Sequence, residues 1–184
     1  MRLSNPIFSG WVNRLLLFLS CCLLSGSIAA SNAEYDVKAA LLFKLSRFIS
    51  WPESDASALP MTICIYGKNP FGKALNSLQK KASKKYSMEI RHFSNVDQGL
   101  DSCHILFISQ AAARQVKSVL LAVSHSPVLT VSDIRLFADS GGMVEFSTKE
   151  KRISFRINLQ AAKNSDIKLA SPLLELATIV SGAP

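Results

Sequence analysis

Short apolar runs alternate with helical segments along the middle of the chain, and this alternation constrains the fold more than any other feature. Strands are expected at 61–66, 86–92, 103–108 and 127–133. Helices are expected between them, at 71–83 and 110–123. Short strands separated by helices imply right-handed crossovers and a mostly parallel sheet covered on both faces. The sequence therefore predicts an α/β fold.

The pattern changes on both sides of this alternation. Residues 35–50 carry apolar side chains at helical spacing, and Trp51 and Pro52 are expected to end that helix. Downstream, "GGMVEFSTKEKRISFRIN" predicts two antiparallel strands around a charged turn at 148–151. The last segment, 159–180, is expected to be helical in two pieces, with Ser171 as the N-cap of the second.

The first 33 residues have the pattern of a cleaved signal peptide. Arg2 and Arg14 flank an N-terminal region without acids, an apolar stretch follows at 15–24, and small residues then satisfy the small-x-small cleavage rule. The apolar stretch is shorter than the roughly 20 residues of a membrane-spanning helix, which disfavours the alternative of an uncleaved anchor. Cys21 and Cys22 lie inside it and form a poor acylation site. We therefore expect a signal peptide at 1–33 and a single periplasmic domain at 34–184.

The net charge of the chain and its predicted compartment limit the classes of molecule that it is expected to bind. The formal charge of the whole chain, +8, becomes +6 when Arg2 and Arg14 leave with the signal peptide. Basic residues gather in "KKASKKYSMEIR", at 80–91, and such a run is usually a solvated face. Nucleic acid is not expected as a partner, because the predicted compartment lacks it. Anionic lipid head groups and cell-wall polymer remain candidates.

Two cysteines remain after the signal peptide. Cys64 and Cys103 each lie in an apolar strand-like run, and an even pair in an oxidising compartment is expected to form a disulfide. The alternative is two buried free thiols in neighbouring strands. His104 adjoins Cys103, but neighbours on a strand point to opposite faces, so a Cys–His nucleophile is not expected. The histidines show no ligand spacing with the cysteines or acids, so no metal site is predicted.

The segment after the first expected strand has the spacing of a phosphate-binding loop. Gly67, Gly72 and Lys73 fit G-x-x-x-x-G-K. The next residue should be Ser or Thr to ligate Mg²⁺, but it is Ala74, and Pro70 stiffens a loop that should wrap phosphate. We therefore expect the glycines to make a strand-to-helix turn, and we expect no ATP or other cofactor.

Asp133 and Asp139 are the remaining candidates for acid–base chemistry. Asp133 follows the fourth expected strand, where loops of a parallel sheet usually bind ligands. The two carboxylates could form an acid–base pair, or they could form turns together with Gly141 and Gly142, which is the favoured interpretation. The G-x-S-x-G and H-E-x-x-H motifs are absent from the sequence. The sequence therefore does not predict an enzyme.

Several blocks of the sequence occur in a characteristic order. They are "YDVKAALLFKLSRFISWP", "ICIYGKNPFGKAL", "CHILFIS", "VLTVSD" running into "FADSGGMVEF", and "ISFRINLQAAKNSDIKLASPLLELA". In this order the chain resembles the YfiR family of periplasmic proteins. The blocks cover essentially the whole predicted mature chain, and the closing block is the most specific of them.

The resemblance implies a Rossmann-like three-layer α/β sandwich without a catalytic role. It also implies a repressor that binds the periplasmic sensor region of an inner-membrane diguanylate cyclase, and so lowers cyclic di-GMP and biofilm formation. Homodimers and binding to cell-wall material are further implications. Cys64 and Cys103 match family positions, which supports their disulfide. A second cysteine pair of some members has no counterpart at 142–155, so a redox switch that needs that pair is not expected here.

Two sets of residues are candidates for binding. A contact surface for the cyclase should combine apolar anchors with a polar rim, and the candidates on the first and last helices are Tyr35, Phe43, Phe48, Trp51, Leu173, Leu174 and Leu176. Helically spaced aromatic residues are more often part of the core, which is the alternative for each. The alternative function is a stand-alone binder of a small molecule or cell-wall fragment. It would use loops after the strands, with Asn69, Asp133, Arg135 and Asp139.

Overall fold

A computed structural model describes residues 27–52, 60–82, 88–96, 99–150 and 152–182. Cys21, Cys22 and part of the basic run at 80–91 lie outside these ranges. The chain divides into two compact units, Met1–Glu34 and Tyr35–Pro184, and the fold of the second is considered below. Among the helices in the described ranges, none is long and apolar enough to cross a membrane.

The helices and strands follow one another in the order expected for most of the chain. They are α2 (Ser27–Leu45), η2 (Ser46–Phe48), β1 (Ile49–Ser50), β2 (Met61–Tyr66), α3 (Ala74–Ala82), β3 (Met88–Phe93), η3 (Leu100–Ser102), β4 (Ile105–Ile108), η4 (Gln110–Gln115), α4 (Val116–Ala122), β5 (Leu129–Ser132), β6 (Val144–Lys149), β7 (Arg152–Asn158), α5 (Leu159–Asn164), β8 (Lys168–Leu169), α6 (Ser171–Glu175) and β9 (Ala177–Val180). The helix predicted at 110–123 is a 3₁₀ turn, η4, that continues into α4.

Seven of the described strands form one sheet in the order β3-β2-β4-β5-β6-β7-β9. Every neighbouring pair is parallel except the β6–β7 hairpin. The prediction of a mostly parallel sheet with a C-terminal antiparallel hairpin is therefore confirmed. β1 and β8 pair separately and antiparallel.

The last segment differs from its prediction. Helices α5 and α6 are separated by β8, and β9 follows as a strand that pairs with β7 through Ala177 and Phe155. Thr178, Ile179 and Val180 are β-branched, which suits a strand, but the pairing partner lies far upstream and local periodicity does not report it. Ser171 is the first residue of α6 rather than its N-cap, because Ala170 takes the cap position.

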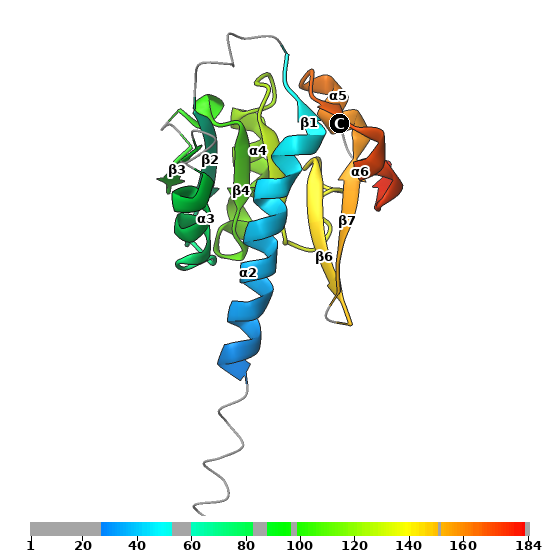
Figure 1. Cartoon of the computed structure of the whole chain (residues 1–184). Coiled ribbons are helices and arrows are strands. Elements are labelled where there is room, and N and C mark those ends of the chain that lie inside the picture. The colour runs from blue at the N-terminus through cyan, green and yellow to red at the C-terminus, as the bar shows by residue number, and fades with distance from the viewer. Residues whose placement is uncertain (1–26, 53–59, 83–87, 97–98, 151, 183–184) are drawn as a thin grey trace, which may run out of the picture. The chain divides into compact units, whose positions relative to one another are not determined.

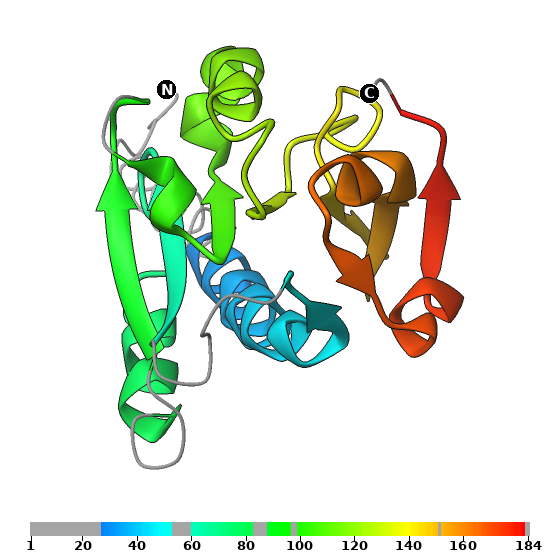
Figure 2. The same ribbon diagram turned by 90° about the horizontal axis from the view of Figure 1, so that it is seen from above.

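Helices cover both faces of the sheet, which makes three layers. α2, α3, α5 and α6 pack on one face through a cluster that includes Leu42, Leu75, Phe107 and Leu173. η3, η4 and α4 cover the other face, around Leu106 and other buried residues. Figure 1 shows α2 crossing the first face, and Figure 2, seen from above, shows α2 and α4 on opposite sides of the sheet.

Residues 133–143, here called the crossover segment, connect the parallel strands β5 and β6 without a helix. Phe137 from this segment is buried in the cluster under α4. Gly142 lies so close to the Phe137 ring that a Cβ atom there would overlap it. The segment thus replaces a crossover helix, and Phe137 packs where that helix would cover the sheet.

Candidate functional site

Asp133, at the carboxyl end of β5, forms a buried ion pair with α2. The Nζ atom of Lys38 donates to its Oδ2 at 2.7 Å, and the side chains are 5% and 1% exposed. The hydroxyl of Tyr35 donates to the same oxygen at 2.8 Å. Lys38 also lies over the Tyr35 ring, 4.6 Å from its centroid. Because buried charges need partners, these contacts give Asp133 a role in holding α2 on the sheet.

The carboxyl edge also carries two buried oxygens without a hydrogen-bond partner among the described residues, Ser109 Oγ and Asp133 Oδ1. These residues directly follow β4 and β5, whose last residues, Ile108 and Ser132, pair in register. Gly67 packs on the same site, since a Cβ atom there would lie 2.7 Å from Ser109 Oγ. Sequence reasoning missed Ser109, which carries no motif.

The loop after β2 occupies the place where a doubly wound sheet usually binds its ligand. The chain goes from β2 to β3 on one side and then to β4 on the other, so the switch point lies between β2 and β4. Phe71 from this loop is 2% exposed. Its ring centroid lies 5.7 Å from that of Tyr35 and 4.7 Å from that of Phe107. An aromatic side chain therefore fills the crevice beside the glycines that resemble a phosphate loop.

Asn69 and Gly67 shape that loop. The Oδ1 atom of Asn69 accepts a hydrogen bond from the backbone N–H of Phe71 at 2.9 Å, which is an Asx turn. Gly67 has a φ of +87°, a conformation that favours glycine. Asn69, a ligand-loop candidate, thus has a structural contact that directs Phe71 into the crevice.

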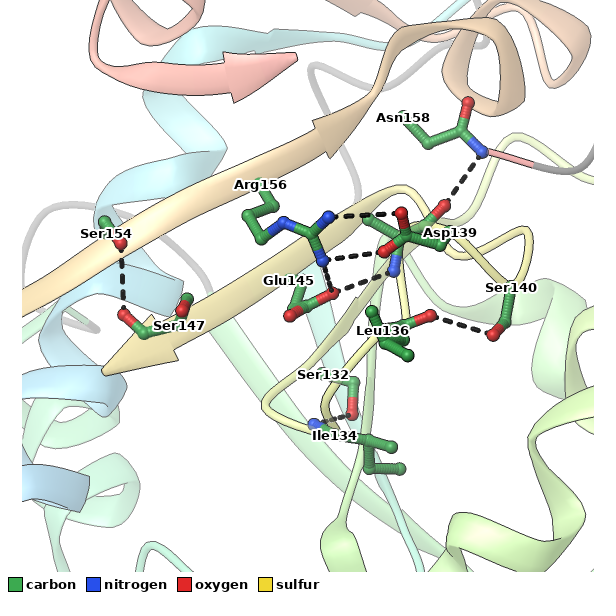
Figure 3. Close-up of polar contacts among 11 residues, drawn as sticks. Ser132, Ile134, Leu136, Asp139, Ser140, Glu145, Ser147, Ser154, Arg156 and Asn158 are labelled. Carbon is green, nitrogen blue, oxygen red and sulfur yellow. Dashed lines mark hydrogen bonds and ion pairs between the residues drawn. The ribbon is translucent and has the colours of Figure 1, made fainter. Parts of the chain in front are cut away.

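Asp139 belongs to a second polar network, which joins the crossover segment to the β6–β7 hairpin (Figure 3). Arg156 Nη1 and Nη2 donate to its two carboxylate oxygens at 2.6 and 3.1 Å, and Nη1 also donates to Glu145 at 3.1 Å. The hydrogen bond from Arg156 holds the pKa of Asp139 below its usual range. Asn158 completes the network by donating to the carbonyl of Ala138 at 3.1 Å.

The two acids that the sequence left open as an acid–base pair, against the favoured interpretation as turn formers, therefore have separate basic partners. Asp133 binds Lys38, whereas Asp139 binds Arg156. The side chain of Asp133 is buried, so it presents no carboxylate to solvent. Arg135, between them in sequence, is exposed. Sequence reasoning also missed Glu145 and Arg156, although an acid in the apolar run "MVEF" is a sign of a buried polar contact.

Two cavities lie elsewhere on the described surface. A groove of about 860 Å³ runs along α4, with α5 and part of the crossover segment opposite. A second cavity of about 470 Å³ is lined by Trp51 together with residues near β8. Neither of these two cavities is lined by Asn69, Asp133 or Arg135. The ligand-loop residues thus do not border either cavity.

Cys64 and Cys103 are joined by a disulfide, with Cα atoms 5.9 Å apart. Cys64 is in β2 and Cys103 directly follows η3, in the cluster under α4. Both are buried, with 0% and 4% of their surface exposed. The bond therefore ties the core of the sheet to the loop that leads into β4, in agreement with the sequence prediction.

A family model described as YfiR/HmsC-like matches residues 35–178, which is nearly the whole second unit. The chain belongs to the YfiR/HmsC-like family. This family is periplasmic, and its proteins are regulators rather than enzymes. The resemblance recognised from the sequence blocks is therefore confirmed.

A solved structure shares the fold at low sequence identity. It is described as the ABC domain in complex with L-Trp from Streptococcus pneumonia, and it matches with a TM-score of 0.56 and 11% identity. The match covers 79% of this chain and 60% of that one, so this chain spans about three fifths of its length. At this identity the likeness concerns the α/β fold alone.

The partner-surface candidates of this YfiR/HmsC-like protein differ in exposure. Leu173 is 3% exposed and belongs to the core. Five others are partly buried and pack against the same core: Tyr35, Phe43, Phe48, Trp51 and Leu174. Leu176 is 72% exposed, and Ile179 on β9, which sequence reasoning did not select, is 48% exposed. Leu176 and Ile179 thus expose apolar surface around α6 and β9, while Val37, Leu121 and Leu136 are exposed elsewhere.

Proposed function

We propose that the protein is a periplasmic repressor that binds the sensor region of a membrane-bound diguanylate cyclase and keeps its catalytic domain inactive. The observation that carries this proposal is the YfiR/HmsC-like match over residues 35–178. The internal contacts of Asn69, Asp133 and Asp139 argue against acid–base catalysis by these residues, because each side chain already holds part of the fold together.

The contact surface in this proposal is the α6–β9 edge, defined by Leu174, Leu176 and Ile179. β9 pairs with β7 on one side, and no described strand pairs with its other side. Residues 176–184 contain no charged side chain, so the edge lacks the lysines that usually prevent pairing with another chain. An uncharged edge strand beside exposed apolar residues suits a partner that adds an extended segment or an apolar face.

Repression then follows from differential binding. The protein lowers cyclase activity only to the extent that it binds the inactive state of the sensor more tightly than the active state. About 1.4 kcal/mol of difference in binding free energy shifts the ratio of the two states tenfold.

The test is complementation in a strain that retains the cognate cyclase. Deleting the gene should raise cyclic di-GMP, and the wild-type gene should restore the low level. Leu176→Glu should fail to restore it, because a charge would enter the apolar contact. Val37→Glu is the control, since Val37 on α2 is 51% exposed and belongs neither to the α6–β9 edge nor to the groove along α4. An unchanged cyclic di-GMP level after deletion would contradict the repressor role, whereas full repression by Leu176→Glu would contradict only the surface.

The alternative function is a stand-alone binder that uses the loops at 67–71, 133–135 and 139–142. It has less support, because the polar side chains of these loops make internal contacts. A pull-down from membranes with the tagged protein separates the two proposals. Capture of a membrane protein with a cyclase domain supports the repressor, and capture of no membrane partner supports the binder.

A further inference from the structure

The groove along α4 has the size and lining of a small-molecule site. Its volume, about 860 Å³, falls within the range of roughly 300–1,000 Å³ that such sites occupy. Its apolar lining residues come from α4 and the residue after it, from the end of the crossover segment and from α5, and they include Val116, Leu120, Leu121, Val123, Met143 and Ala161. Leu121 is 74% exposed, so a large apolar side chain stands uncovered at the rim.

The charge around this groove has one sign. Arg114 and Lys117 are among its lining residues, and both are exposed. No Asp or Glu lines it, and no ion pair of the described residues involves Arg114 or Lys117. By contrast, Lys38 on α2 and Arg156 on the β6–β7 hairpin are each paired with an acid. Apolar surface and uncompensated positive charge thus meet along α4.

This combination selects for an amphipathic anion. An acidic head group would be attracted by the guanidinium and ammonium groups of the rim, an uncharged ligand would gain nothing from them, and a cation would be repelled. α4, which forms one wall of the groove, has seven residues and therefore extends about 10 Å at 1.5 Å per residue. A ligand with one acidic head and a short apolar body fits this length.

We propose that the groove along α4 binds a small amphipathic carboxylate. Its apolar body packs against Leu120, Leu121 and Met143. Its head lies at the rim, where Arg114 and Lys117 donate hydrogen bonds to it. The site is separate from the α6–β9 edge, and it does not depend on the proposed repressor function.

The probe is sodium decanoate, below its micelle concentration, titrated into protein purified from the periplasm and followed by calorimetry. Saturable one-site binding is expected. Shortening the chain should weaken binding up to about fourfold for each methylene removed. Raising the ionic strength should also weaken it, because the charges are exposed. Decyltrimethylammonium, with the opposite charge, should bind at least tenfold more weakly.

Matched variants assign the binding to the groove. Leu121→Glu should weaken decanoate binding at least tenfold, while Val37→Glu, at an exposed apolar residue outside the groove and outside the α6–β9 edge, should leave it within twofold of wild type. Lys117→Glu should weaken binding, while Lys163→Glu, on α5 but not in the groove lining, should not. All four positions are exposed, so folding should be retained.

Three outcomes would overturn the proposal: no saturable binding of decanoate, equal affinity for the cationic analogue, or equal affinity of Leu121→Glu and wild type. Binding of an acidic amphipathic peptide in place of decanoate would also overturn it and assign the groove to a protein partner. None of these results bears on the repressor function, because the readout is binding by the isolated protein.

Discussion

The ammonium group of Lys38 on α2 lies 2.7 Å from Oδ2 of Asp133 at the end of β5, and both side chains are almost fully buried. Replacing Lys38 by Met would leave the Asp133 carboxylate buried without its cation. We expect the free energy of unfolding to fall by about 3–5 kcal/mol. Urea unfolding measures it, with Lys44→Met as the control, because Lys44 is exposed on the same helix. Equal stabilities of the two variants would contradict a structural role for the pair.

The disulfide should contribute more to stability than any single surface contact. Cys64 and Cys103 are 39 residues apart, and closing a loop of that size is worth about 4 kcal/mol in the chain-entropy model. The free energy of unfolding of the double variant Cys64→Ala/Cys103→Ala should be lower than that of wild type by this amount. Wild-type protein unfolded in the presence of a reductant should have nearly the same free energy of unfolding as the double variant. If mass mapping without reductant found both cysteines alkylated as free thiols, the bond would be disproved.

The contact between Asp139 and Arg156 should make stability sensitive to acid. The hydrogen bond from Arg156 lowers the pKa of Asp139 from about 3.8. The folded state therefore favours the charged carboxylate over the protonated acid more than the unfolded state does. This part of the stability is present above the unfolded pKa and is lost as pH falls through the lower, folded pKa. Asp139→Asn should therefore reduce the loss of stability below about pH 4. Urea unfolding of wild type and Asp139→Asn at steps of about one pH unit from pH 2 to 6 measures this difference.

The control for that series is Asp101→Asn, an exposed acid on η3 outside the network. It should leave the acid dependence close to that of wild type. Identical pH profiles for Asp139→Asn and wild type would show that Arg156 does not hold Asp139 in solution.

His104 should give a second pH dependence, at milder acidity. Burial lowers the pKa of His104 below about 6.5, and its Nδ1 accepts a hydrogen bond from the backbone N–H of Thr62 at 3.1 Å. The unfolded state therefore takes up a proton more readily. This contribution to stability is full above the unfolded pKa near 6.5, and it is lost as pH falls toward the folded pKa. His104→Asn, which can keep an acceptor but does not titrate, should flatten stability between about pH 7.5 and 5.5.

An NMR titration of the His104 ring tests the same point directly. Its midpoint should lie below that of a model histidine peptide. A midpoint at or above the peptide value would show that burial does not govern the protonation of this ring.

The sequence predicted the central sheet well because its signals are local. In β2, the run "MTICIY" is almost entirely apolar, and a strand buried on both faces needs no other feature to be recognised. β9 was missed because its strand character depends on pairing with β7, and "ATIV" directly follows a helix. Ser171 was misplaced by one residue because both it and Ala170 precede Pro172, which suits the first turn of a helix.

For the candidate site, the sequence predicted where the acids lie but not which residues they contact. The sequence placed Asp133 and Asp139 in loops near the strands, but it could not tell which cation each would meet. Lys38 lies 95 residues from Asp133, and Arg156 lies 17 residues from Asp139. Leu173 and Leu176 illustrate the same limit, because they are three positions apart near one helix and yet one is buried and the other is 72% exposed.

By itself, the sequence determined the α/β class, the parallel sheet with its hairpin, the cysteine pair and the family, because each depends on residue types in order along the chain. Only the tertiary structure decided that Phe71 fills the switch point, that each acid is paired with a distant cation, and that a basic apolar groove lies along α4. These properties depend on which side chains the folded backbone brings within a few ångströms of each other, and no local pattern encodes that distance.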